Sequence, residues 1–252
     1  MFWLLVAAAL CTGFILLGNW QLRRLTWKLK LIHDVSTRVH APPEAPPGPS
    51  MWPMVREGHL QYLHVRLNGH FMAGTPTLVH GTSPDGYGYW LMAPFQTEDG
   101  FIVLINRGYV PANWGLPSAR GLLASPGNVR TITGLLRFSE PKGGFLRSNQ
   151  PATNQWYSRD VDAIAQAQGL SIGLTAPYFI DEDAHPGVHA WPAGGLTKIH
   201  FRNAHLGYAI TWYGMALTVL IGAGILTWRS MHPKRADTRN SADGGSPEPE
   251  HS

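Results

Sequence analysis

The sequence predicts a membrane protein in which two transmembrane α-helices flank an α+β soluble domain built mainly of antiparallel β-strands. Two apolar stretches near the ends of the 252-residue chain, residues 1–22 and 206–228, contain no charged side chain. Each is long enough to cross the ~30 Å hydrocarbon layer of a membrane as a helix. Between them, short runs of β-branched and aromatic residues alternate with glycine and proline turns, a pattern typical of strands.

The first stretch, residues 1–22, is predicted to be an uncleaved transmembrane helix, because no basic residue precedes its apolar run as in a signal peptide. In residues 23–37, apolar residues recur at helical spacing with basic residues beside them. This indicates an amphipathic helix along the membrane surface, with anionic lipids as partners, or a continuation of the first helix packed on the soluble domain. Residues 41–49, A-P-P-E-A-P-P-G-P, predict an extended proline-rich linker that completes the segment 23–49.

Residues 50–203 are expected to form the α+β domain, followed by the second transmembrane helix at 204–228 and a disordered tail at 229–252. One helix is predicted from Val161 to Gln168, with a stop at Gly169. Strands are predicted at His59–Leu67, Thr75–His80, Tyr87–Phe95, Phe101–Ile105, Val129–Phe138 and Pro177–Asp181.

Composition excludes several classes of function. The net charge is +4 and 14% of the residues are charged, without the basic stripe and interleaved aromatics of a nucleic-acid-binding protein. A single cysteine, Cys11, cannot form a disulfide framework or a multi-cysteine metal site. No nucleophile elbow, phosphate-binding loop or dinucleotide fingerprint occurs, so we predict that the protein is not an enzyme. The acidic run Asp181–Asp183 is expected to be a solvated turn.

The second apolar stretch begins beside a histidine. On a helix, His205 shares a face with Tyr208 and Trp212, at the boundary of the membrane. One interpretation is a belt of interfacial aromatics with a solvated histidine. The other is a ligand for a flat apolar cofactor. Gly214 and Gly222, with Thr218 between them, form a ridge of small residues that predicts how the two spans pack together.

In the soluble domain, Asn106 and Arg107 follow the apolar strand Phe101–Ile105 directly. We expect Arg107 to emerge at a strand end with a turn at Gly108, where it could clamp a carboxylate or bridge loops. A second polar group contains Trp156 and Arg159. There, Arg159 and the following aspartate could equally be a helix-capping pair.

Several motifs occur in order between the two spans. They are G-N-W-Q-L-R-R-L-T-W-K at 18–28, Y…G-H-F at 62–71, P-F at 94–95, I-N-R-G-Y-V-P at 105–111, W-Y-S-R-D at 156–160 and F-R-N-A-H-L-G-Y-A-I-T-W-Y at 201–213. Together they resemble the surfeit locus protein 1 family of cytochrome c oxidase assembly factors. The resemblance covers residues 14–228.

The resemblance implies a non-enzymatic protein of the bacterial inner membrane that crosses it twice, with the soluble domain in the periplasm. Basic residues near the spans are more numerous on the domain side, which by itself would favour a cytoplasmic domain. We follow the resemblance on this point. It also implies oxidase subunit I as a partner, with heme a synthase and membrane lipids as further partners and no nucleic acid.

The resemblance further implies heme a as a cofactor that is inserted into subunit I. His205 matches the candidate iron ligand of bacterial members. On this heme hypothesis, Tyr208 and Trp212 would contact the macrocycle, and Arg24 or Arg202 would pair with the propionates. The resemblance also points to Trp20 and Gln21. Arg107, Asn106, Trp156 and Arg159 are expected to contact a partner or to be structural. The alternative is a cofactor-free membrane scaffold that stabilises an oxidase assembly intermediate.

Overall fold

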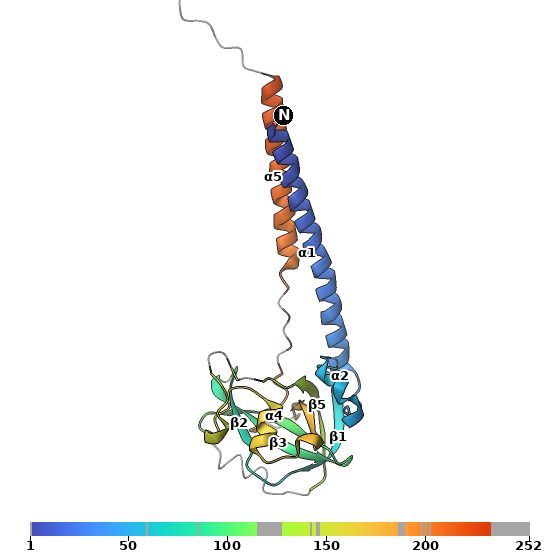
Figure 1. The fold of residues 1–252 in the computed structure, drawn as a ribbon, viewed down its shortest axis with the longest axis vertical. Coiled ribbons are helices and arrows are strands. Elements are labelled where there is room, and N and C mark those ends of the chain that lie inside the picture. The colour runs from blue at the N-terminus through green and yellow to red at the C-terminus, as the bar shows by residue number, and fades with distance from the viewer. Residues whose placement is uncertain are drawn as a thin grey trace, which may run out of the picture. The chain divides into compact units, whose positions relative to one another are not determined.

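The computed structural model of this chain describes residues 2–232, apart from residues 59, 85, 115–127, 142, 145–146, 186–189, 198, 200 and 202. The chain divides into two compact units (Figure 1). One contains residues 1–29 and 202–252, and the other contains residues 30–201. Helix α1 (Phe2–His40) is continuous from the first unit into the second, so the predicted amphipathic segment is an extension of the first helix. Most of the predicted disordered tail lies outside the described residues.

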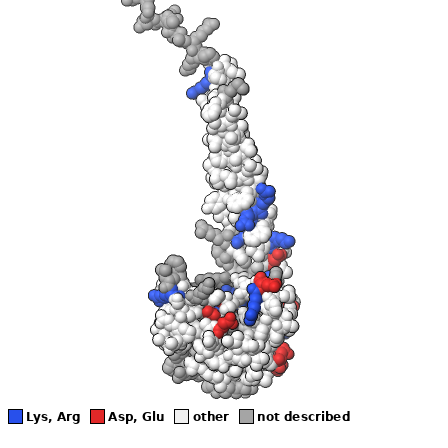
Figure 2. All heavy atoms as spheres, in the orientation of Figure 1, with Lys and Arg blue, Asp and Glu red and all other residues white. Residues whose placement is uncertain are grey.

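Two helices in the described part of the chain, α1 and α5 (His205–Met231), are long and apolar enough to cross a membrane. Their large apolar side chains point outward, as shown by the exposure of Leu5, Leu16, Ile210 and Leu217. Such exposure costs roughly 25 cal/mol per Å² in water but nothing in lipid. In Figure 2, a long charge-free stretch separates the charged atoms at the two ends of the helix pair. The pair therefore has the surface that a lipid environment requires.

The two helices pack where α5 carries small residues and α1 carries a glycine. Ala209 and Ala216 of α5 are buried. A Cβ on Gly18 would lie 2.7 Å from the ring of Tyr213, so only glycine leaves room for that ring. The Tyr213 hydroxyl donates a hydrogen bond of 2.8 Å to Oδ1 of Asn19. Packing and hydrogen bonding together set the register of α5 against α1.

The prediction that the small residues Gly214, Thr218 and Gly222 form the packing face of α5 was wrong. No atom lies within 4 Å of a Cβ built on Gly214 or Gly222, and Thr218 is exposed. One residue along a helix turns the side chain by about 100°, so Gly214 faces away from the side that Tyr213 presents to α1. Close helix approach uses Gly18 and the two alanines instead.

We expect Gly18→Ala to destabilise the helix pair, because the added methyl group must displace a ring that Asn19 holds in place. Overpacking of this kind costs about 1–3 kcal/mol. Gly214→Ala is the matched control, since it adds the same methyl group to open space and gains helix propensity. Thermal unfolding of the full-length protein in detergent measures both variants. Equal melting temperatures for the two would contradict the packing described here.

The second unit is built around a sheet with the strand order β1-β5-β6-β4-β3-β2, in which β1 also pairs with β3. This additional pairing closes five strands into a barrel and leaves β2 beside β3. Among the strand pairs of the described residues, only β4 and β6 run parallel, which confirms the mainly antiparallel prediction. The strands are β1 (His64–Phe71), β2 (Thr77–Ser83), β3 (Gly86–Thr97), β4 (Ile102–Pro111), β5 (Arg130–Phe138) and β6 (Thr175–Glu182).

All six predicted strands are present, with two differences of consequence. The first begins at His64 and not at residue 59, because Leu60 and Tyr62 adopt positive φ angles of 74° and 61° that a strand cannot contain. The fourth continues six residues beyond Ile105, to Pro111. This second difference changes the position of Arg107, as described below.

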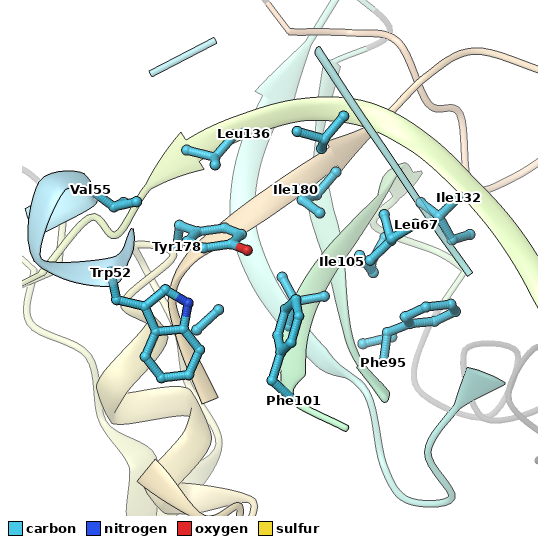
Figure 3. Close-up of a cluster of buried hydrophobic side chains, with 14 of the residues drawn as sticks. Trp52, Val55, Leu67, Phe95, Phe101, Ile105, Ile132, Leu136, Tyr178 and Ile180 are labelled. Atoms are coloured by element: carbon cyan, nitrogen blue, oxygen red, sulfur yellow. The ribbon is translucent and has the colours of Figure 1, made fainter. Parts of the chain in front are cut away.

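An apolar cluster occupies the barrel interior, and α2 (Trp52–Arg56) covers it at one end (Figure 3). Trp52 packs edge-on against Phe101, at 6.2 Å between ring centroids. The Trp52 indole and the Tyr178 hydroxyl both donate hydrogen bonds to the carbonyl of Pro47, at 3.1 and 2.8 Å. Burial raises the pKa of Tyr178, which keeps this hydroxyl a donor. A short 3₁₀ helix at Pro49–Met51 leads into α2.

The proline-rich segment 41–49 packs on the domain and does not stand apart from it. Glu44 pairs with β1 through two backbone hydrogen bonds, to His64 and Arg66, and Pro47 is buried. The segment therefore joins α1 to the barrel through specific contacts.

An outer layer covers one face of the sheet, where α4 (Val161–Ala167) packs with short 3₁₀ turns at Pro151–Thr153 and Ile172–Leu174 (Figure 1). Val161 and Ile164 join Leu104 and Phe179 in a second apolar cluster. Asp160 caps the helix. Its Oδ1 accepts a hydrogen bond of 3.2 Å from the backbone N–H of Ala163. The predicted helix is confirmed.

Candidate functional site

Two groups of polar side chains stand out, one in each unit. The first joins α1 and α5. Nδ1 of His205, the first residue of α5, lies 2.8 Å from Oε1 of Gln21 on α1. Gln21 is only 8% exposed, whereas His205 is partly open to its surroundings. Sequence reasoning named both residues, and the structure brings them into direct contact.

The other helix residues of the predicted site are arranged less closely. Trp212 stacks on Phe14 of α1, with 5.8 Å between ring centroids and 27° between planes, and so contributes to helix packing. Tyr208 and Trp20 are 57% and 48% exposed, and each presents an aromatic ring outside the helix pair. Neither ring has a described contact with His205.

Arg24 lies on the outer surface of α1. Its guanidinium sits over the ring of Trp27, 5.1 Å from the centroid, and it makes no described contact with His205. An exposed guanidinium of this kind retains donors for an anionic group. Arg202, the other predicted propionate partner, lies outside the described residues.

At the start of α5, His205 offers one imidazole as a possible metal ligand. No group of three or more His, Cys, Asp or Glu side chains capable of holding a metal ion occurs in the part of the chain that the structure describes. Protein sites for bare transition metals require three or four such ligands. A heme iron already has four ring nitrogens and needs only an axial ligand, which one imidazole supplies. Nε2 of His205 has no hydrogen-bond partner among the described side chains.

The second polar group lies on the outer face of the barrel and is centred on a buried carboxylate. Asp181 is 5% exposed. Its two oxygens accept four hydrogen bonds, from Nδ2 of Asn106 at 2.7 Å, Nη1 of Arg137 at 2.8 Å, Oγ1 of Thr197 at 2.8 Å and Nη1 of Arg159 at 3.3 Å. The strand register explains the convergence, because Asn106 pairs with Asp181 and Arg137 with Phe179 two positions earlier.

Arg159 completes this network with a two-pronged contact to Glu140. Its Nε and Nη2 donate to the two carboxylate oxygens of Glu140 at 3.0 and 2.6 Å. Burial alone would lower the pKa of Arg159, but the Glu140 hydrogen bond and the Asp181 charge outweigh it and raise this pKa. The guanidinium also lies over the Phe179 ring, 4.8 Å from its centroid. Beside the network is a cavity of about 170 Å³, lined in part by Trp90.

Arg107 does not emerge at a strand end, which corrects the sequence prediction. Trp90 pairs with Tyr109 and Met92 pairs with Asn106, so β4 contains one extra residue at this point, a β-bulge at Arg107 and Gly108. Gly108 has a φ of 125°, and a Cβ there would collide with the carbonyl oxygen of Ala193. Alternation along β4 places Arg107 on the inner face, with Val103 and Ile105, and Asn106 on the outer face. The bulge reverses this alternation for the residues that follow Gly108.

On the inner face, Arg107 forms a buried ion pair with a carboxylate of the same domain. Its Nε lies 3.5 Å from Oε2 of Glu182, and its guanidinium lies 4.7 Å from the ring centroid of Phe71. Burial lowers the pKa of Arg107, although Glu182 acts in the opposite direction and Arg130 adds to the decrease.

The acidic run at 181–183 was wrongly read as a solvated turn. Asp181 and Glu182 end β6 and are 5% and 4% exposed. They directly follow an almost fully buried apolar run, which could have indicated this, but their buried arginine partners are 22 to 75 residues away. Trp156 is structural as well, with 1% exposure and an indole N–H bonded to Asn154 at 2.8 Å.

Comparison with known proteins now identifies the chain. The model of the SURF1 family matches residues 8–217. The chain belongs to the SURF1 family. The match begins within α1, includes the whole barrel and extends into α5, so it contains Gln21 and His205 and the network around Asp181.

Curated relatives agree with this SURF1 assignment. Surfeit locus protein 1 of Mus musculus is 34% identical over 215 residues, which cover 79% of this chain and 67% of the relative. Surfeit locus protein 1 of Homo sapiens is 33% identical over 217 residues, which cover 79% of this chain and 69% of the relative. SURF1-like protein of Caenorhabditis elegans is 28% identical over 226 residues, with 81% and 68% covered. The resemblance stated from the motifs is confirmed.

Proposed function

We propose that this SURF1 protein is a non-catalytic assembly factor for cytochrome c oxidase that binds heme a through His205 and assists its insertion into subunit I. Family membership supports the assembly role. The heme role depends on one observation, the contact between His205 and Gln21 at the start of α5. This contact presents an imidazole beside an apolar helix pair and leaves Nε2 without a described partner.

The surroundings of His205 suit the chemical parts of heme a. Its iron accepts an imidazole nitrogen, and its long apolar tail partitions into hydrocarbon, as the exposed leucines of the helix pair also do. Tyr208 and Trp20 offer exposed rings for a flat macrocycle, and Arg24 offers exposed donors for a carboxylate. The protein contributes binding and orientation, and no bond need be made or broken by its side chains.

We further propose that the protein resides in a bacterial inner membrane with α1 and α5 as its two spans and the barrel in the periplasm. Subunit I is the recipient of heme a, and heme a synthase is the source. The barrel supplies a rigid surface on which an assembly partner can rest, because its polar side chains are tied into the networks around Asp181 and Glu182.

The test combines a spectrum with a genetic deletion. The full-length protein is purified from a host that makes heme a, and the oxidase of a deletion strain is assayed for heme a content and abundance. We expect heme absorbance in the purified protein at about one equivalent or less. In the deletion strain we expect subunit I to have lost most of its heme a, with normal levels on complementation.

The outcomes separate the proposal from its alternative. A purified protein without heme, in a strain whose deletion still depletes the oxidase, would replace heme binding by a cofactor-free scaffold. An oxidase that is fully hemylated and abundant in the deletion strain would overturn the assembly role itself.

A further inference from the structure

The contact between Gln21 and His205 carries information on the tautomer of the histidine. In the neutral imidazole, one ring nitrogen bears a proton and the other bears the lone pair. Nδ1 lies 2.8 Å from the amide oxygen of Gln21, which can only accept. With the amide oxygen of Gln21 toward the ring, as the structure has it, Nδ1 is the donor and carries the proton, and the lone pair is on Nε2, the nitrogen with no described partner.

The helix pair holds Gln21 in the position this contact requires. Gln21 is 8% exposed, so it cannot turn to water without separating the helices. Nearby on α1, Asn19 accepts a hydrogen bond from Tyr213, and the ring of Tyr213 rests on Gly18. These contacts fix the rotation of α5 relative to α1 and so place His205 beside Gln21. The ligand position is therefore a property of both helices.

We infer that Gln21 is a positioning residue that holds His205 as the Nδ1–H tautomer and so makes Nε2 the nitrogen available to heme iron. This inference rests on the proposed function and deepens it. Gln21 acts through His205 and does not itself touch the cofactor, which revises its expected role as a heme contact. Metal-binding histidines generally need such a partner on the second nitrogen, and its loss commonly costs 10–100-fold in affinity.

Because the Gln21 side chain is uncharged, it also affects how tightly His205 would bind heme iron. A carboxylate in this position would make the imidazole more basic and bind the iron more tightly. A neutral amide orients the ring without this increase, as suits a protein that must release its heme. We therefore expect Gln21→Leu to weaken heme binding and Gln21→Glu, which keeps the acceptor and adds charge, to strengthen it.

Two measurements on the full-length protein in detergent test this inference. The first is ¹⁵N NMR of the histidine side chains in heme-free protein at alkaline pH, where imidazoles are neutral. We expect a proton on Nδ1 of His205 in the wild type and a shift toward Nε2–H in Gln21→Leu. The second is heme a titration, in which Gln21→Leu should weaken binding by about 10-fold or more.

Thr26→Val is the control, because it also replaces a polar side chain of α1 but removes only an exposed hydrogen bond to the carbonyl of Arg23, and it leaves Gln21 and the contacts between the helices intact. It should keep the Nδ1–H tautomer and should bind heme more tightly than Gln21→Leu. A wild type with Nε2–H that still binds heme would overturn this inference alone. A wild type with Nδ1–H that binds no heme would overturn the proposed heme role together with the positioning role.

Discussion

His205→Ala is expected to abolish heme absorbance in the purified protein and to leave the helix pair assembled. The alanine variant loses the imidazole at the start of α5, which is the proposed nitrogen donor. Helix packing should persist, because Ala209, Ala216 and the Gly18–Tyr213 contact lie further along the pair. Absorbance spectra and circular dichroism of the same preparation measure the two effects.

Two controls make this result specific. His33→Ala removes an exposed imidazole from α1 and should leave the heme spectrum unchanged. Free imidazole added to His205→Ala should restore part of the absorbance, because the lost group is then supplied from solution. Full heme absorbance in His205→Ala would show that the iron is bound elsewhere, and the heme assignment would then be wrong.

Asp181→Ala should have the largest effect on the barrel, a loss of about 3–5 kcal/mol in the free energy of unfolding. The variant leaves Arg137 and Arg159 largely buried with one carboxylate, Glu140, between them. It also leaves the amide of Asn106 and the hydroxyl of Thr197 without their acceptor. Chemical denaturation of the full-length protein, monitored by tryptophan fluorescence, measures the loss.

Smaller changes in the same network provide reference values for this loss in the free energy of unfolding. Thr197→Val removes a single hydrogen bond to Asp181 and should cost about 1 kcal/mol. In a double-mutant cycle, Arg137→Leu should offset part of the loss in Asp181→Ala, because the uncompensated buried charge is removed. If Asp181→Ala is no less stable than Thr197→Val, the buried charge network adds no more to stability than one hydrogen bond from the half-buried Thr197 does.

The network has a structural consequence for the chain that leads to α5. Thr197 binds Asp181, Gly195 donates to the carbonyl of Glu182, and Ala193 pairs with Tyr109 in the extension of β4. The segment after β6 is therefore fastened to the barrel at three points. The bulge at Gly108 is part of this arrangement, because it admits the backbone of Ala193.

Sequence patterns located the elements because the signals are local. A charge-free apolar stretch indicates, from its own residues, a helix long enough to cross a membrane, and alternation indicates a strand in the same way. The corrections arose where local signals were absent or ambiguous. Positive φ at Leu60 and Tyr62 delays β1, and the Gly108 bulge lets β4 continue where a turn was expected. The small residues Gly214 and Gly222 suggested a packing surface. In a helix composed of small and apolar residues, however, the sequence does not show which face packs against the neighbouring helix.

The residues alone determined two apolar helices, a β-rich domain between them, a histidine at the start of the second helix, and the family. Tertiary structure alone decided that the strands close into a barrel, that Asp181 is buried between two arginines, and that Gln21 meets His205 across 184 residues of chain. The reason is physical, because the hydrophobic periodicity of a segment shows only whether its own residues are buried or exposed. A hydrogen bond between distant residues depends on helix register and strand pairing, which the packing of the whole unit sets.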